Sequence, residues 1–250
     1  MLELINAFEF SAIDWAIAAL CGLMIGMAKA GVTGAGIMII PIMAMVFGGK
    51  ASTGIVLPML ITADVFAVKY YNRNANWGYL IKLLPWAAAG ILIAMVLGNA
   101  ISDAMFKRIL SISILAGVGL MIWQDVKKEV NIPDNKLIAA VLGLAGGFTT
   151  MIGNAAGPVL SLYLLSMRVP KLVFIGTAAW FFLLVNLFKV PLHIFVWKTI
   201  TAQTLVFNLL MVPAIIGGVF LGIQIVKIIP ERPYRILVIV TIAISSLLLL

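Results

Sequence analysis

Two glycine-rich clusters interrupt long apolar stretches of this sequence, one in each half of the chain. The first cluster consists of Gly22, Gly26, Lys29, Gly31, Thr33, Gly34 and Gly36, and the second consists of Gly143, Gly147, Thr149, Thr150, Gly153, Asn154 and Gly157. Glycine is unfavourable inside a helix and readily adopts the backbone conformations that end one. The clusters therefore predict a broken or re-entrant helix in each half.

A nearly constant spacing relates the two halves. The pairs Gly22/Gly143, Gly26/Gly147, Gly36/Gly157 and Lys50/Lys171 are 121 residues apart, Gly54/Gly176 and Asp64/Asn186 are 122 apart, and Pro85/Pro213 and Gly90/Gly218 are 128 apart. Chance would not readily produce an ordered series in which the spacing only grows. The series indicates a duplicated unit, with repeat one at 11–124 and repeat two at 136–250.

The composition places this duplicated unit in a membrane. Hydrophobic residues make up 64% of the chain and charged residues only 10%. Soluble domains are about half apolar and about a quarter charged, so we expect an all-α integral membrane protein. Because the sequence has no long polar stretch, residues 1–250 are expected to form a single membrane domain.

Ten apolar segments can be recognised, at 11–28, 32–48, 52–71, 78–100, 104–124, 136–152, 155–167, 172–190, 199–226 and 232–250. Six of them approach the roughly 20 residues that a helix needs to cross a bilayer. The first, second, sixth and seventh segments are shorter and meet at the glycine clusters. They are either short tilted spans or paired half-helices that enter the membrane and turn back.

The basic residues divide unequally between the two sides of such a chain. Eleven Lys and Arg residues fall in one set of connections and five in the other, whether the short segments cross or turn back. The richer set is expected in the cytoplasm, which puts both termini outside. Each repeat then has an odd number of crossings, so the second copy enters from the opposite side. The two helical bundles are therefore expected to form an inverted repeat.

Lys29 is the most distinctive charged residue, because it follows a mostly apolar segment and directly precedes a run of glycines. Backbone amides at a helix break bind anions, and an ammonium group beside them adds a full charge. The residues expected to bind a small anion are Lys29, Gly31, Thr33, Gly34, Gly36, Thr149, Thr150, Asn154 and Gly157. The alternatives are a lysine that extends to the lipid headgroups and glycines that only pack helices.

Asp64 lies deep in the third apolar segment, and its counterpart in the second repeat is Asn186. An ionisable residue at membrane depth is costly unless it is paired or faces water. We therefore expect Asp64 and Asn186 to have a coupling or structural role, with Asp64 as a proton carrier or as the partner of a cation. His193 follows Pro191 in a connection, and we expect it at the membrane interface.

The sequence lacks the motifs of common enzyme classes. It contains no Walker A loop, no HExxH or GxSxG motif and no cluster of Cys and His. We therefore expect a protein that is not an enzyme and that has no cofactor or metal. The net charge of +8 comes mostly from Lys and Arg between apolar segments, which indicates contact with headgroups and no nucleic-acid partner.

The sequence resembles the TauE/SafE family of sulfite-exporter-like membrane proteins over nearly its whole length. The stretches that carry the resemblance include GMAKAGVTGAGIMIIPIMA and KASTGIVLPMLITADVFAVKYY in the first half and GFTTMIGNAAGPVLSLYLL in the second. The resemblance implies export of small sulfur oxyanions or organosulfonates, such as sulfite or sulfoacetate, across the bacterial inner membrane. The second cluster departs from the more glycine-rich common form of the family at Thr149, Thr150, Asn154, Ala155 and Ala156, which leaves the exact substrate open.

A duplicated membrane unit with a helix break in each copy is typical of a secondary transporter. The leading hypothesis is a transporter that exports a small anion by alternating access. The alternatives are an anion channel lined by the same residues and a membrane subunit with no transport role. The expected partners are a small inorganic or organic anion, the lipid bilayer, protons as a candidate coupling ion and a second copy of the chain in a candidate homodimer.

Overall fold

The computed structural model describes residues 12–32, 35–102, 135–167 and 169–230, together with isolated residues between 104 and 119 and residue 233. Within these ranges the chain is helical and contains no strand. The elements are α2 (Ala12–Lys29), α3 (Ala35–Phe47), α4 (Gly49–Tyr71), η1 (Asn72–Asn74), α5 (Trp77–Ala100), α7 (Lys136–Gly153), α8 (Gly157–Ser166), α9 (Lys171–Pro191), η2 (Leu192–Val196) and α10 (Ala202–Ile228). The predicted segments at 104–124 and 232–250 lie almost entirely outside the described residues.

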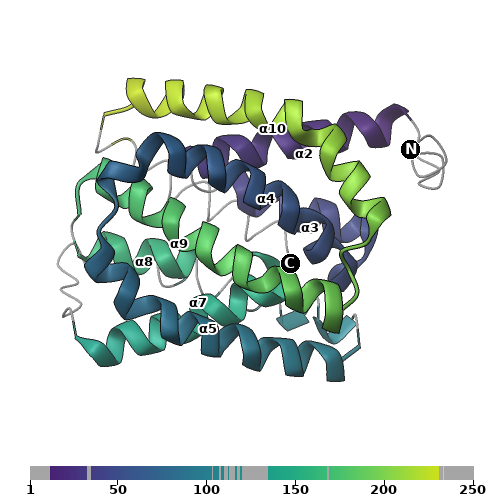
Figure 1. Ribbon diagram of the computed structural model, residues 1–250, viewed down its shortest axis with the longest axis horizontal. Coiled ribbons are helices and arrows are strands. Elements are labelled where there is room, and N and C mark those ends of the chain that lie inside the picture. The colour runs from purple at the N-terminus through teal and green to yellow at the C-terminus, as the bar shows by residue number, and fades with distance from the viewer. Residues whose placement is uncertain are drawn as a thin grey trace.

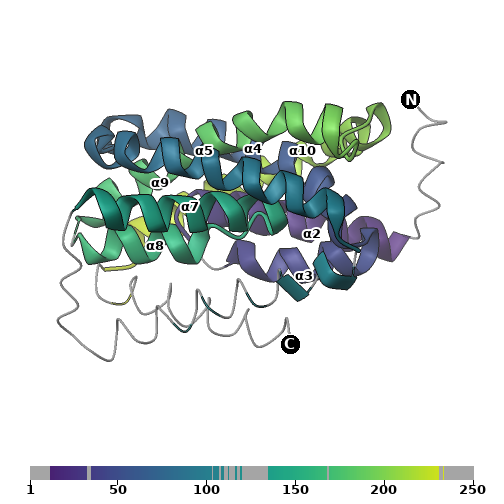
Figure 2. The ribbon, with the colours of Figure 1, turned by 90° about the horizontal axis from the view of Figure 1, so that it is seen from below.

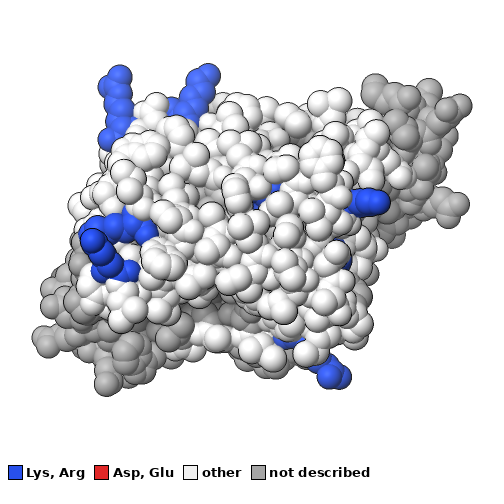
Figure 3. Space-filling model, turned by 60° about the horizontal axis from the view of Figure 1, so that its bottom comes forward, with Lys and Arg blue, Asp and Glu red and all other residues white. Residues whose placement is uncertain are grey.

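Each of the other eight predicted segments corresponds to one helix, which confirms the all-helical class. In the described part of the chain, the helices long and apolar enough to cross a membrane are Gly49–Asn74, Trp77–Ala100, Lys136–Gly153, Lys171–Val196 and Ala202–Ile228. Their surfaces carry exposed apolar side chains such as Leu92, Val96, Leu209 and Phe220. On the face drawn in Figure 3, Lys and Arg protrude mainly near the margins, and most of the surface between them is uncharged. Such a surface suits contact with lipid chains.

The first glycine cluster ends α2 and separates it from α3. Gly31 has a φ of 116°, a conformation that glycine adopts without a steric penalty. The N–H of Val32 donates to the carbonyl of Met27 at 3.0 Å, which is the long hydrogen bond of a Schellman motif. Gly31 thereby allows the chain to leave the helix directly after Lys29 while the last carbonyls remain bonded.

The second glycine cluster produces a similar interruption with a different residue. α7 ends at Gly153 and α8 begins at Gly157. Between them, Asn154 has a φ of 57°, a left-handed conformation that Asn tolerates better than most residues. Pro158 lies in the first turn of α8, where its fixed φ and missing N–H are tolerated. Helices are therefore interrupted at both predicted clusters.

Helices α4 and α9 lie side by side in the middle of the molecule, between the α2/α10 pair and the α5/α7 pair (Figure 1). The two short helices, α3 and α8, lie on the same side of this arrangement (Figure 2). α4 and α9 are the third described helices of the first and second predicted repeats. The fold thus brings corresponding helices of the two halves together at its centre.

Close glycine contacts join α2 to α10. Gly26 lies against the carbonyl oxygen of Ile215, and Gly218 lies against the carbonyl oxygen of Leu23. A Cβ atom at either glycine would overlap that oxygen. Small residues at such positions allow two helix backbones to approach closely inside a membrane.

The α5/α7 pair repeats this arrangement with equivalent residues. Gly147 lies against the carbonyl oxygen of Ala87, and Gly90 lies against the carbonyl oxygen of Leu144. Each of these four positions lies 121 or 128 residues away from its counterpart in the α2/α10 contact. Residues that match at these sequence spacings therefore also make matching contacts between helices.

Replacing Gly218 by alanine is expected to destabilise the protein, because the added methyl group would overlap the carbonyl oxygen of Leu23. We expect a loss of about 1–3 kcal/mol in the free energy of unfolding, seen as a lower thermal midpoint in detergent. Gly217→Ala is the matched control, because a Cβ atom there has no neighbour within 4 Å and alanine favours a helix. Equal midpoints for the two variants would contradict the close contact.

Candidate functional site

An ion pair lies at the end of α2, beside the first helix interruption. The Nζ atom of Lys29 is 2.9 Å from Oδ1 of Asp64 on α4. The side chain of Asp64 is fully buried, and that of Lys29 is 11% exposed. Lys29 therefore extends into the helix bundle and does not reach out to lipid headgroups. Pairing compensates part of the large cost of removing both charges from water.

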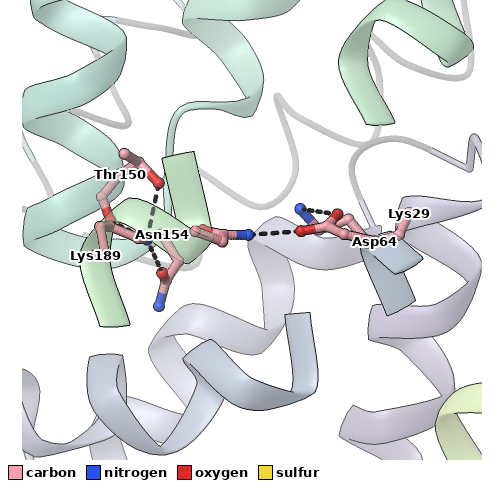
Figure 4. A network of polar contacts seen from close by, with 6 residues as sticks. Lys29, Asp64, Thr150, Asn154 and Lys189 are labelled. Atoms are coloured by element: carbon pink, nitrogen blue, oxygen red, sulfur yellow. Dashed lines mark hydrogen bonds and ion pairs between the residues drawn. The ribbon is translucent and has the colours of Figure 1, made fainter. Parts of the chain in front are cut away.

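Asn186 on α9 occupies the other oxygen of the same carboxylate. Its Nδ2 donates to Oδ2 of Asp64 at 2.7 Å, and both side chains are buried. Asp64 is the counterpart of Asn186 at the 122-residue spacing, so two equivalent residues of the predicted repeats bond to each other. Figure 4 shows the Lys29–Asp64 pair and, beside it, a second group of polar residues.

The second group contains a lysine that the sequence did not single out. Lys189 on α9 is 0% exposed. Its Nζ donates to the carbonyl oxygen of Thr150 at 3.0 Å, to Oγ1 of Thr150 at 3.1 Å and to Oδ1 of Asn154 at 2.6 Å. The amide of Asn154 in turn donates to the carbonyl of Thr53 on α4 at 3.2 Å. A lysine that is buried or nearly so thus lies at each helix interruption (Figure 4).

The position of Lys189 follows from the continuation of α9. The apolar segment predicted at 172–190 ends one residue after Lys189, so the sequence alone puts this lysine at the end of a segment. In the structure α9 continues to Pro191 and is followed by η2, so the lysine remains inside the bundle. Residues three and four apart share a helix face, and Phe182, Asn186 and Lys189 are spaced in that way. That spacing is the sequence signal that would have linked Lys189 to Asn186.

His193 lies one turn beyond Lys189 and is buried in the protein. The residue is 0% exposed. Its Nδ1 is 2.8 Å from the hydroxyl of Thr199, and its ring packs edge-on against Trp197. The chain after α9 folds back over the histidine, and this cover is not visible in the local sequence pattern.

A small cavity adjoins Lys29. Its volume is about 20 Å³, which is room for about one water molecule. Apart from Lys29 the lining is apolar or glycine: Ala28, Gly31, Phe174, Ile175, Ala178, Ala179 and Phe182. The Nζ of Lys29 lies 3.7 Å from the centre of the Phe182 ring, a cation–π contact. The cavity therefore opens on the same face of α9 that carries Asn186 and Lys189.

The remaining predicted site residues differ in their placement. The hydroxyl of Thr149 donates to the carbonyl of Ala145 at 2.8 Å, so this side chain bonds to its own helix. Gly31 is buried at the cavity. Gly36 and Gly157 lie in the first turns of α3 and α8, and Thr33 and Gly34 lie outside the described residues. The structure thus brings together Lys29, Asp64, Asn186, Thr150 and Asn154, with Lys189 added.

Removing one member of the buried ion pair is expected to destabilise the protein strongly. Asp64→Ala leaves the Lys29 ammonium without its carboxylate, at a cost of about 3–5 kcal/mol. The double variant Lys29→Met/Asp64→Ala removes both charges and is expected to regain part of that loss. The measurement is the thermal midpoint of each purified variant in detergent. A double variant less stable than the single one would contradict a direct charge pair.

One comparison with known proteins gave a match. The family model described as Sulfite exporter TauE/SafE matches residues 18–249, nearly the whole chain. The comparisons with curated proteins and with solved structures gave no match.

Proposed function

The chain belongs to the TauE/SafE family of sulfite exporters, and we propose that it is a secondary transporter that exports a small anion by alternating access. The proposed substrate is sulfite or an organosulfonate such as sulfoacetate. The observation that carries the proposal is a pair of inward-facing lysines at two helix interruptions inside an apolar bundle: Lys29, whose side chain is 11% exposed, and Lys189, which is buried. A charge at that depth is costly and marks the path of an ion or substrate. Membership in a transporter family is consistent with the expectation that the protein is not an enzyme.

The proposed architecture is an inverted repeat, with units at 11–124 and 136–250. Its support is the correspondence of contacts between equivalent residues. The glycine contacts of α2 with α10 match those of α7 with α5, and Asp64 bonds to its own counterpart, Asn186. Two equivalent residues meet only near the axis that relates two copies. Inverted-repeat transporters place their substrate site near such an axis, at the level of broken helices.

The proposed anion site combines charge from side chains with donors from the backbone. Lys29, Gly31, Thr33, Gly34 and Gly36 would contribute from the first interruption, and Thr149, Thr150, Asn154 and Gly157 from the second. The first turns of α3 and α8 begin directly after the two breaks. The amides of a first turn have no partner within their own helix and carry the positive end of its dipole. Asp64 and Asn186 would couple the two halves, with protons as the proposed coupling ion.

The size of the cavity beside Lys29 favours a carrier over a channel. Its volume of about 20 Å³ accommodates a water molecule but not a sulfur oxyanion. Entry of the anion would therefore require the helices around the cavity to separate, as in rocking of one repeat against the other. The family membership supports a place for this carrier in the bacterial inner membrane, and the Lys and Arg distribution supports an orientation with both termini outside.

Replacing Lys29 by glutamine tests the proposed function. We expect the efflux of radiolabelled sulfite from proteoliposomes to fall by about 10–100-fold, because a hydrogen bond to a charged group is worth about 1.5–3 kcal/mol. Lys69→Gln is the control, since Lys69 is an exposed lysine on the same helix as Asp64. Undiminished efflux from a well-folded Lys29→Gln protein would remove Lys29 from the site, and unitary currents in planar bilayers would contradict a carrier.

A further inference from the structure

The polar residues around Asp64 and Lys189 include more basic than acidic side chains. Among the described residues this polar network holds two lysines, Lys29 and Lys189, and one carboxylate, Asp64. Asp64 binds Lys29 directly. The partners of Lys189 are all uncharged: the carbonyl and hydroxyl of Thr150 and the side-chain amide oxygen of Asn154. The three oxygens match the three N–H groups of an ammonium, and with both lysines protonated one positive charge has no carboxylate partner among the described residues.

This uncompensated charge lies on the helix face that leads to the cavity. Phe182, Asn186 and Lys189 share one face of α9 by their spacing. Phe182 and Lys29 line the cavity, and Asn186 bonds to Asp64. Figure 4 shows two neighbouring groups of contacts, one around Lys29 and Asp64 and one around Lys189, Thr150 and Asn154. The next titratable group on this face is His193, whose Nδ1 is paired with Thr199.

We propose that this single excess positive charge makes the transport site selective for monovalent anions over divalent ones. The inference rests on the proposed function and narrows its substrate class to hydrogen sulfite or a sulfonate without a second acidic group, so that sulfoacetate becomes a disfavoured member of the class. A monovalent anion beside Lys189 makes the buried network electrically neutral. A divalent anion leaves a net negative charge in a medium of low dielectric constant, where an uncompensated charge is strongly unfavourable.

Two neighbouring residues allow the charge of the network to be changed without a change in shape. Asp64→Asn raises the net charge of the network by one, and Asn186→Asp lowers it by one. The side chains of Asp and Asn have nearly the same size, and the two residues already bond to each other. The double variant Asp64→Asn/Asn186→Asp moves the carboxylate from α4 to α9 and keeps the total charge of the wild type.

The experiment measures how two sulfonates of similar size inhibit sulfite transport in proteoliposomes. Isethionate carries one negative charge and sulfoacetate carries two, and both contain two carbon atoms. In the wild type, we expect isethionate to inhibit the transport of radiolabelled sulfite at a concentration at least about tenfold lower than sulfoacetate, because an unpaired buried charge is costly. Lys69→Gln, at an exposed lysine of α4, should keep this ratio.

The variants are expected to move the ratio in opposite directions. Asp64→Asn should shift the preference toward sulfoacetate, and Asn186→Asp should weaken inhibition by both anions, most of all by sulfoacetate. The double variant should recover the wild-type ratio of the two inhibitory concentrations. A merely structural role of either residue would not predict this recovery. Size-exclusion chromatography and thermal midpoints establish that each variant is folded.

Several results would overturn the proposal. A wild type that prefers sulfoacetate overturns it without any variant, as does an unchanged ratio in folded Asp64→Asn protein. A double variant that behaves like one of the single variants also overturns it. The preference between monovalent and divalent anions would then not depend on the net charge of the network. In all these cases sulfite is still transported and the proposed function stands. If the wild type moves none of these anions, both the proposed function and the proposed selectivity for monovalent anions are wrong.

Discussion

Asp64 joins helices from both halves of the chain by an ion pair and a hydrogen bond. Its carboxylate binds Lys29 of α2 through one oxygen and Asn186 of α9 through the other. In an apolar bundle such a group is stable only while its partners remain in place. The positions of α2, α4 and α9 are therefore linked. Any movement of one half relative to the other has to exchange, or carry along, the partners of this carboxylate.

The two helix interruptions are similar in backbone but different in charge. At the first, the lysine is the last residue of the interrupted helix and is neutralised by Asp64. At the second, Lys189 comes from α9 and is held by uncharged oxygens of Thr150 and Asn154. The glycine contacts of the two halves correspond, whereas these polar side chains have diverged. Our proposals use this divergence, since Lys29 lies beside a carboxylate and Lys189 does not.

The helices could be predicted from the sequence because lipid contact requires long apolar segments, and the glycine clusters marked where those segments break. The bounds of α4 and α5 differ from the predicted segments by only a few residues. The polar contacts were harder to predict, because they depend on how helices distant in sequence cross. The spacing related Asp64 to Asn186 but did not show that they bond. The burial of Lys189 and His193 was missed for a local reason, since both lie where the apolar pattern weakens and the chain nevertheless remains buried.

The most direct test of the central claim is the position of a bound anion relative to the two buried lysines. Selenite is a close chemical analogue of sulfite, and selenium can be located by its anomalous scattering in crystals of the complex. The account predicts a selenium peak within hydrogen-bonding distance of the Nζ atom of Lys189 or Lys29, between α4 and α9. Peaks confined to exposed Lys and Arg side chains at the helix ends, with none beside the buried lysines, would contradict it.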